Sequence, residues 1–203
     1  MSFLLWSQFV LAIGLLIVSP GPSAALVIQY SKQRHGVYLA AILGGNAASV
    51  TLLVLAAVGL SLVQHEGILL GLQLAGTLYL MYLGISMLKS QQVIRRGRIE
   101  DTPKQALLKG FLVGISNPKD ILFFASFLSI FLPDTGQGWL SALLILLATW
   151  TVVDWLVMLG YAAFFRRQQW LNATGLNRVC GLILCVLALL LCWNVVQAVR
   201  AML

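Results

Sequence analysis

Six long apolar segments, separated by short connections that carry most of the charged residues, form the main pattern along this 203-residue chain. Each segment is long enough to cross a hydrocarbon core of about 30 Å as an α-helix. The pattern therefore predicts an all-α membrane protein, built as a single integral membrane domain over residues 1–203. The predicted transmembrane segments are 3–31, 38–63, 68–88, 103–132, 139–165 and 177–199.

Proline interrupts two of these segments close to their middle. The first contains the sequence Ser-Pro-Gly-Pro at 19–22, and the fourth contains Asn117-Pro118. A proline inside a helix removes one backbone N–H and clashes with the preceding turn, and unpaired backbone groups are costly in lipid unless they line a cavity or meet a ligand. One break alone fits a simple kink, whereas two breaks at matching depths favour a shared binding site.

The chain can be split near residue 100 into two halves with the same organisation, each containing one break. Because each half contains three segments, the second half crosses the membrane in the opposite direction, which is the arrangement of an inverted repeat. The predicted boundaries are about 1–88 for repeat one, 89–102 for a cytoplasmic loop and 103–203 for repeat two. The predicted fold is thus two inverted three-helix repeats in which helices one and four are broken.

Composition and charge support a membrane location. Hydrophobic residues make up 60% of the chain and charged residues only 9%, and no soluble domain of this size can bury that much apolar surface. The net charge is +7, but the basic residues follow the first, third and fifth segments, which is the positive-inside pattern. It predicts both termini outside the cytoplasm, with Arg200 as the one exception, and argues against a nucleic-acid partner.

Three charged residues, Lys119, Asp120 and Asp154, fall deep inside predicted segments. A charge near a helix centre costs about 2.5–3.5 kcal/mol on the insertion scale, so each needs a partner or a cavity. Lys119 and Asp120 are adjacent and do not face one another on a helix, so Asp154 is the expected counterpart of Lys119. That pair is either purely structural, or Asp154 exchanges a proton for a substrate ammonium while Lys119 and the broken helix bind a carboxylate.

The candidate site combines the two breaks, the charges and neutral polar residues on neighbouring segments. Each neutral residue taken singly also fits packing or interfacial anchoring, as do Ser49, Gln73 and Tyr161. The candidate substrate-binding residues are Ser19, Pro20, Gly21, Pro22, Asn46, Tyr79, Asn117, Pro118, Lys119 and Asp154. The candidates for proton coupling are Asp154 and Asp120.

Small residues recur at four-residue spacing in three segments and predict faces where helices pack closely, within one bundle or between subunits. These are Gly67 with Gly71, Gly110 with Gly114, and the stripe of Ala40, Gly44 and Ala48.

Enzymatic and cofactor chemistry has little support in the sequence. Zinc-protease, phosphate-loop and serine-hydrolase motifs are absent. His35 and His65 lie at opposite ends of the second segment, so no metal or cofactor is predicted. Asp120 with Asp154 would be an aspartyl-protease pair only if they shared a proton, which Lys119 disfavours. An intramembrane enzyme and a membrane scaffold remain as alternatives to a transporter.

Five short motifs lie along nearly the whole chain. They are Ser19-Pro20-Gly21-Pro22, the sequence GTLYLMYLG at Gly76–Gly84, Asn117-Pro118-Lys119, Val153-Asp154 and Gly160-Tyr161-Ala162. In their order and spacing these motifs resemble the lysine exporter superfamily, with the greatest likeness to its homoserine/threonine efflux branch.

The resemblance implies a secondary transporter that exports amino acids or close relatives across a bacterial inner membrane in exchange for protons. Its expected partners are the substrate, protons and the lipid bilayer, and homo-oligomerisation is left open. One departure concerns the second segment, where some members have an acidic residue near the position of Asn46 or Ser49 and this chain has none. Because a dibasic substrate would need a second buried carboxylate, for which only Asp120 is available, we expect neutral substrates.

Overall fold

A computed structural model describes residues 3–62, 66–89, 93–95, 101–132, 136, 138–167, 170–172 and 174–202. His65 and most of the predicted loop 89–102 lie outside the described residues.

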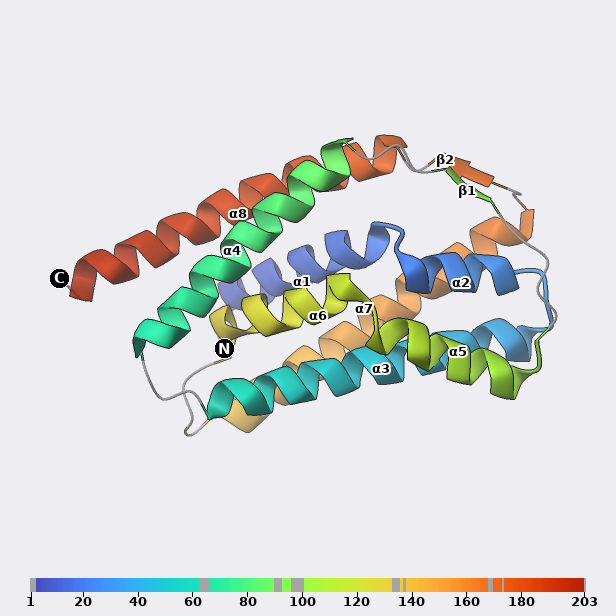
Figure 1. The fold of residues 1–203 in the computed structure, drawn as a ribbon, viewed down its shortest axis with the longest axis horizontal. Coiled ribbons are helices and arrows are strands. Elements are labelled where there is room, and N and C mark those ends of the chain that lie inside the picture. Colours follow the sequence, from blue (N-terminus) through green and yellow to red (C-terminus); the bar gives the residue numbers. More distant parts are fainter. Residues whose placement is uncertain are drawn as a thin grey trace.

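Helices account for almost all of the described part of the chain, and they follow the six predicted segments (Figure 1). The prediction of an all-α membrane protein is therefore confirmed. The helices are α1 Phe3–Val18, α2 Pro22–Tyr30, α3 His35–Ser61, α4 Glu66–Lys89, α5 Pro103–Ile115, α6 Pro118–Phe127, α7 Trp139–Arg167 and α8 Thr174–Met202, with a 3-10 turn η1 at Leu128–Ile130.

The two proline breaks are present at the predicted positions. α1 and α2 meet at an angle of 57°, and α5 and α6 meet at 50°. In both breaks the second helix begins with a proline in its first turn, preceded by an extended residue, Gly21 or Asn117. Proline is well suited to this position because its fixed φ starts a helix and the missing N–H is not needed there. Four described helices can span a membrane singly, or six segments if each bent pair forms one span.

Close glycine contacts hold the helices together in pairs, as the small-residue spacing predicts. A Cβ on Gly110 of α5 would lie 2.3 Å from the Ala41 carbonyl oxygen of α3, and one on Gly44 would lie 2.1 Å from the Leu107 carbonyl oxygen. α4 and α8 approach in the same way through Gly84 and Gly181. These faces lie within the bundle.

The remaining predicted glycine face differs, because a Cβ on Gly71 would meet nothing within 4 Å in the described structure. This position on α4 therefore packs against no other described helix.

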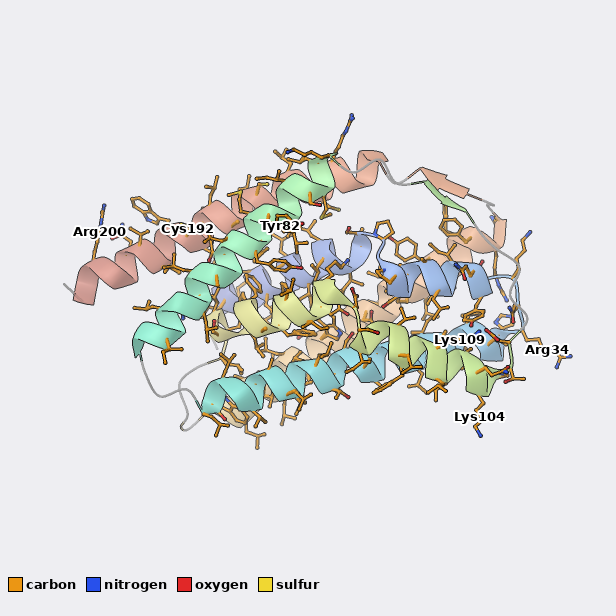
Figure 2. All side chains as sticks on the ribbon, in the orientation of Figure 1. Arg34, Tyr82, Lys104, Lys109, Cys192 and Arg200 are labelled. Atoms are coloured by element: carbon orange, nitrogen blue, oxygen red, sulfur yellow. The ribbon has the colours of Figure 1, made fainter. Side chains whose placement is uncertain are left out.

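One end of the bundle gathers the connections that carry basic residues. Arg34, Lys104 and Lys109 lie at this end, whereas Arg200 lies toward the other (Figure 2), as do both chain ends (Figure 1). Two three-residue strands, Val93–Arg95 (β1) and Trp170–Asn172 (β2), form an antiparallel pair at the basic end, with Ile94 opposite Leu171. This arrangement agrees with the threading inferred from charge. That the basic end faces the cytoplasm stays a prediction.

Three groups of helix neighbours agree with the predicted inverted repeat, whereas the contacts of α4 with α6 and of α8 with α1 do not correspond to each other in the two halves. α3 packs against α5 and α6, α7 packs against α1 and α2, and the third members α4 and α8 pack against each other (Figure 1). A twofold relation between the halves would exchange the first two of these groups and preserve the third. The repeat itself stays a prediction.

Candidate functional site

A cavity of about 30 Å³, lined by charged, polar and apolar residues, lies where the two helix breaks meet. It is lined by residues from both broken segments and from α3 and α7, two helices that are continuous through the bundle. The polar and charged lining residues are Ser19, Ser23, Ser49, Asn117, Lys119, Asp120 and Asp154. The glycine and apolar lining residues are Ile17, Gly21, Ala24, Leu26, Val27, Ala41, Ile42, Gly45, Gly110, Trp150 and Met158.

Lys119 contacts the end of α1 and not Asp154. Its ammonium donates hydrogen bonds to the carbonyl oxygens of Leu16 and Ser19, the second at 2.8 Å. These carbonyls have no intrahelical partner because α1 ends there, and the C-terminal end of a helix attracts a cation. The predicted Lys119–Asp154 ion pair is therefore wrong. Within the described residues the ion pair that forms is Lys109–Asp101.

Tyr161 on α7 satisfies a third carbonyl at the same helix end. Its hydroxyl donates to the Val18 carbonyl oxygen at 2.5 Å. Side chains from α6 and α7 thus replace the intrahelical hydrogen bonds that α1 lacks where it ends at the break. Without these donors the carbonyls would be unpaired in an apolar bundle, which costs free energy.

Two buried carboxylates face the cavity, and α3 provides one hydrogen-bond donor for each. The Asn46 side-chain amide donates to Asp154 Oδ2 at 3.0 Å, and the Ser49 hydroxyl donates to Asp120 Oδ2 at 3.1 Å. The four residues are 5–7% exposed. The polar side chains of α3 therefore hold the two carboxylates in place, and Asp120 has a defined partner that the sequence did not indicate.

The two half-helices that begin at the breaks differ in capping. Asn117 caps α6, its side-chain oxygen accepting a hydrogen bond from the Lys119 backbone N–H at 3.2 Å. At the start of α2 the capping residue is Gly21, which provides no side-chain hydrogen bond. A Cβ on Gly21 would lie 3.6 Å from Lys119 Nζ. The N-terminal end of α2, which favours anions, is thus open beside the ammonium.

The predicted site residues are gathered only in part. Ser19, Gly21, Asn117, Lys119 and Asp154 line the cavity together with Asp120, and Asn46 reaches it through Asp154. Pro20, Pro22 and Tyr79 are not among the lining residues. Pro20 and Pro22 belong to the α1–α2 break, Pro118 begins α6, and Tyr79 stacks on Tyr82 on α4.

Trp150 and Met158 are lining residues that the sequence analysis did not identify. Both lie four residues from Asp154 on α7, one on each side. Positions four apart share one face of a helix, so the spacing to a buried aspartate was the signal that could have found them.

In this conformation the cavity is large enough for water but too small for an amino acid. A water molecule needs about 10–15 Å³ of such space, so the volume of about 30 Å³ fits about two waters. An amino acid has at least five non-hydrogen atoms, and the cavity would have to widen to admit one. The site thus offers opposite charges and helix-end dipoles around a small volume.

A multi-pass helical membrane protein with a charged central cavity between two broken helices is the class that this fold and site define. The family model described as LysE type translocator matches residues 15–194, and the chain belongs to this family. Members of the family are transporters, so the chain is a translocator and not an enzyme. The resemblance to the lysine exporter superfamily is thereby confirmed.

Curated relatives include bacterial efflux proteins. The chain is 32% identical over 193 residues to a homoserine/homoserine lactone efflux protein of Salmonella typhimurium, covering 89% of this chain and 92% of the relative. It is 33% identical over 163 residues to a leucine efflux protein of Enterobacter sp., covering 75% of each. It is 35% identical over 192 residues to an uncharacterized membrane protein of Pseudomonas aeruginosa, covering 84% and 87%. No solved structure matches the chain.

Proposed function

We propose that this translocator exports neutral amino acids or their derivatives from the cytoplasm across a bacterial inner membrane, in exchange for protons and by alternating access. The observation that carries the proposal is the cavity lined by Lys119, Asp120 and Asp154 between the two breaks. Groups that attract a carboxylate and groups that attract an ammonium face one small volume, which suits a zwitterion.

Charge counting supports exchange with a proton. One ammonium and two carboxylates sum to −1 when all are ionised, and an uncompensated charge inside a low-dielectric bundle is unfavourable. A proton or the ammonium of a substrate can compensate that charge locally at one carboxylate, while the substrate's own carboxylate is held apart from it at the N-terminal end of α2. Because both neutralise the same carboxylates, they compete, and competition for one site is what antiport requires. Asp154 and Asp120 are the proposed proton-coupling residues.

The substrate carboxylate is proposed to bind at the open N-terminal end of α2, beside Lys119. An ammonium has three donors, and two of those on Lys119 are used by the carbonyls of Leu16 and Ser19. The third donor and the uncapped N–H groups after Gly21 provide an anion site.

Neutral substrates are favoured by the charges available. A second substrate cation would need a second carboxylate, and the only other one in the lining is Asp120, which already accepts a hydrogen bond from Ser49. The names of the curated relatives, homoserine, homoserine lactone and leucine efflux proteins, agree with neutral side chains.

Alternating access is supported by the small volume of the cavity, about 30 Å³. Substrate entry needs the breaks to move apart. We propose that the repeats, about 1–88 and 103–203, rock against each other around the cavity.

Proteoliposomes with an imposed pH gradient test the proposal. Wild-type protein is expected to drive accumulation of L-homoserine or L-leucine, and Asp154→Asn is expected to abolish it. Asp101→Asn is the control, because that carboxylate lies outside the cavity. Full pH-driven flux in Asp154→Asn would refute its coupling role, and a wild type that moves no neutral amino acid would refute the function.

The proposed carboxylate contact has its own test. Lys119→Ala is expected to weaken binding of L-leucine more than binding of its methyl ester, since the ester lacks the carboxylate. Equal losses for the two ligands would show that Lys119 acts only on the end of α1.

A further inference from the structure

Trp150 carries a buried hydrogen-bond donor with no acceptor in the described structure. The residue is 1% exposed, and its indole Nε1 has no hydrogen-bond partner. Indole nitrogen can only donate, and buried Tyr and Trp side chains usually find a partner for their polar atom. A donor left unpaired inside a bundle costs free energy unless a ligand supplies the acceptor.

A second tryptophan shows how the fold satisfies an indole that has a structural role. Trp6 Nε1 on α1 donates to Thr149 Oγ1 at 3.1 Å, and Thr149 directly precedes Trp150 on α7. The fold thus pairs the indole of Trp6 and leaves the indole nitrogen of Trp150, a residue that lines the cavity, without a partner in the described structure.

Trp150 lies beside the groups proposed to bind substrate. It lines the cavity together with Asp154, which follows one turn later on the same face of α7. Side chains four residues apart on a helix have Cβ atoms about 5–6 Å from each other. A substrate whose ammonium meets Asp154 would therefore place an atom of its side chain close to the indole.

The ring of Trp150 is held by aromatic neighbours on α6. Phe124 meets it edge to face with a centroid separation of 4.5 Å, and Phe123 lies at 6.3 Å. A rigid donor recognises an acceptor at little entropic cost, as required for specificity. The apolar lining residues Val27 and Met158 suit the aliphatic part of a side chain.

We propose that the Nε1–H of Trp150 is a specificity donor, which binds an oxygen acceptor on the side chain of the transported amino acid. This inference rests on the proposed function and deepens it, because it selects side chains with a hydroxyl or carbonyl oxygen over aliphatic ones of equal size. A site with a buried donor discriminates against analogues that leave it unpaired.

L-Homoserine and L-norvaline provide a matched pair of probes, since a terminal hydroxyl in one replaces a methyl group in the other. In proteoliposomes, wild-type protein is expected to transport homoserine better than norvaline. Trp150→Phe is expected to lower the ratio of homoserine to norvaline transport about tenfold, because transport of homoserine falls and transport of norvaline does not. Trp155→Phe is the matched control on the same helix, because Trp155 packs against the core and does not line the cavity.

A second variant guards against loss of folding. Replacement of Trp150 by 3-benzothienylalanine keeps the ring shape and exchanges the N–H for sulfur, and it is expected to reduce the preference to the same extent as Phe.

Three outcomes would overturn the inference. Equal losses for both probes would assign Trp150 to packing or to the substrate carboxylate, which the two probes share. An unchanged preference in both variants would show that the N–H interacts only with the face of a neighbouring ring. A wild type that moves neither these probes nor leucine would instead remove the proposed function, and the inference with it.

Discussion

The Lys119 ammonium donates a 2.8 Å hydrogen bond to the Ser19 carbonyl oxygen, joining the beginning of one broken helix to the break of the other. The two residues are 100 positions apart. Their contact explains how the bundle tolerates a lysine in its interior, since the cation replaces hydrogen bonds that α1 loses at its end. It also places the ammonium beside Gly21, where it is available to an anion.

Lys119→Met is expected to destabilise the fold. The apolar side chain fills similar space but leaves the Leu16 and Ser19 carbonyls without their donor, and unsatisfied buried acceptors cost about 1–3 kcal/mol each. We expect the free energy of unfolding in mild detergent to fall by about 2 kcal/mol or more. Lys104→Met is the control, since Lys104 is exposed on α5 (Figure 2). Equal stability of the two variants would contradict this role.

Gly110→Ala is expected to separate α3 from α5. The added Cβ would lie 2.3 Å from the Ala41 carbonyl oxygen, a backbone atom that cannot move without shifting the helix. Overpacking of this kind costs about 1–3 kcal/mol, so the melting temperature should fall clearly. Gly160→Ala on α7 is the matched control, because its Cβ would meet nothing within 4 Å and alanine favours a helix by about 1 kcal/mol. A Gly110→Ala variant as stable as Gly160→Ala would refute the close contact.

Asp101, at the basic end of the bundle, makes stability depend on pH. Hydrogen bonds from the Lys109 ammonium and the Tyr30 hydroxyl hold the pKa of Asp101 below its usual value. A carboxylate whose folded-state pKa is lowered stabilises the fold above its unfolded pKa, about 3.9, and this contribution is lost as the pH falls through the folded value.

The difference in melting temperature between wild type and Asp101→Asn should therefore be constant from pH 7 to about pH 5 and shrink on further acidification. A thermal-shift series over pH measures it, with Lys109→Met as the second arm of a double-mutant cycle. If the difference in melting temperature instead grew as the pH fell, the pKa of Asp101 would be raised in the folded protein and not lowered.

Features that depend on local chemistry were predictable from the sequence. The length of an apolar segment defines a membrane helix, and a proline without its N–H breaks one wherever it stands in the interior. The close face at Gly110 followed from four-residue spacing alone. These features do not depend on which residues lie on the neighbouring helices.

Partners across the bundle were not predictable in the same way. A lysine in lipid needs acceptors, and the sequence offered Asp154 as the obvious one, whereas the end of α1 provides two carbonyls that no residue type reveals. The donors for Asp154 and Asp120 were likewise set by the register of α3, which brings Asn46 and Ser49 to the two carboxylates. Opposing helix faces are fixed by tertiary packing.

Contacts at the basic end close the bundle on the side where α2 ends. Arg166 of α7 donates to the Ser31 carbonyl oxygen at 3.3 Å, and its guanidinium lies 2.9 Å from His35 Nε2 and over the ring of Tyr38. α2 runs from the cavity at its first turn to this end, so in the proposed alternating-access cycle an opening at the basic end would break the contacts of Arg166. We expect Arg166→Met to shift the protein toward the state open at the basic end.

Cysteine labelling measures this shift. With Cys180, Cys185 and Cys192 replaced by serine, Ser23→Cys places a single thiol in the cavity lining. A membrane-impermeant maleimide supplied from the basic end should react several-fold faster when Arg166→Met is added, because the open state is more populated. Arg167→Met is the matched control, since Arg167 is exposed beside it and has no hydrogen bond or ion pair in the described structure. Identical rates in the two variants would mean that Arg166 does not hold this end closed. The barrier to entry would then lie nearer the cavity, which Val27 and Ala41 line.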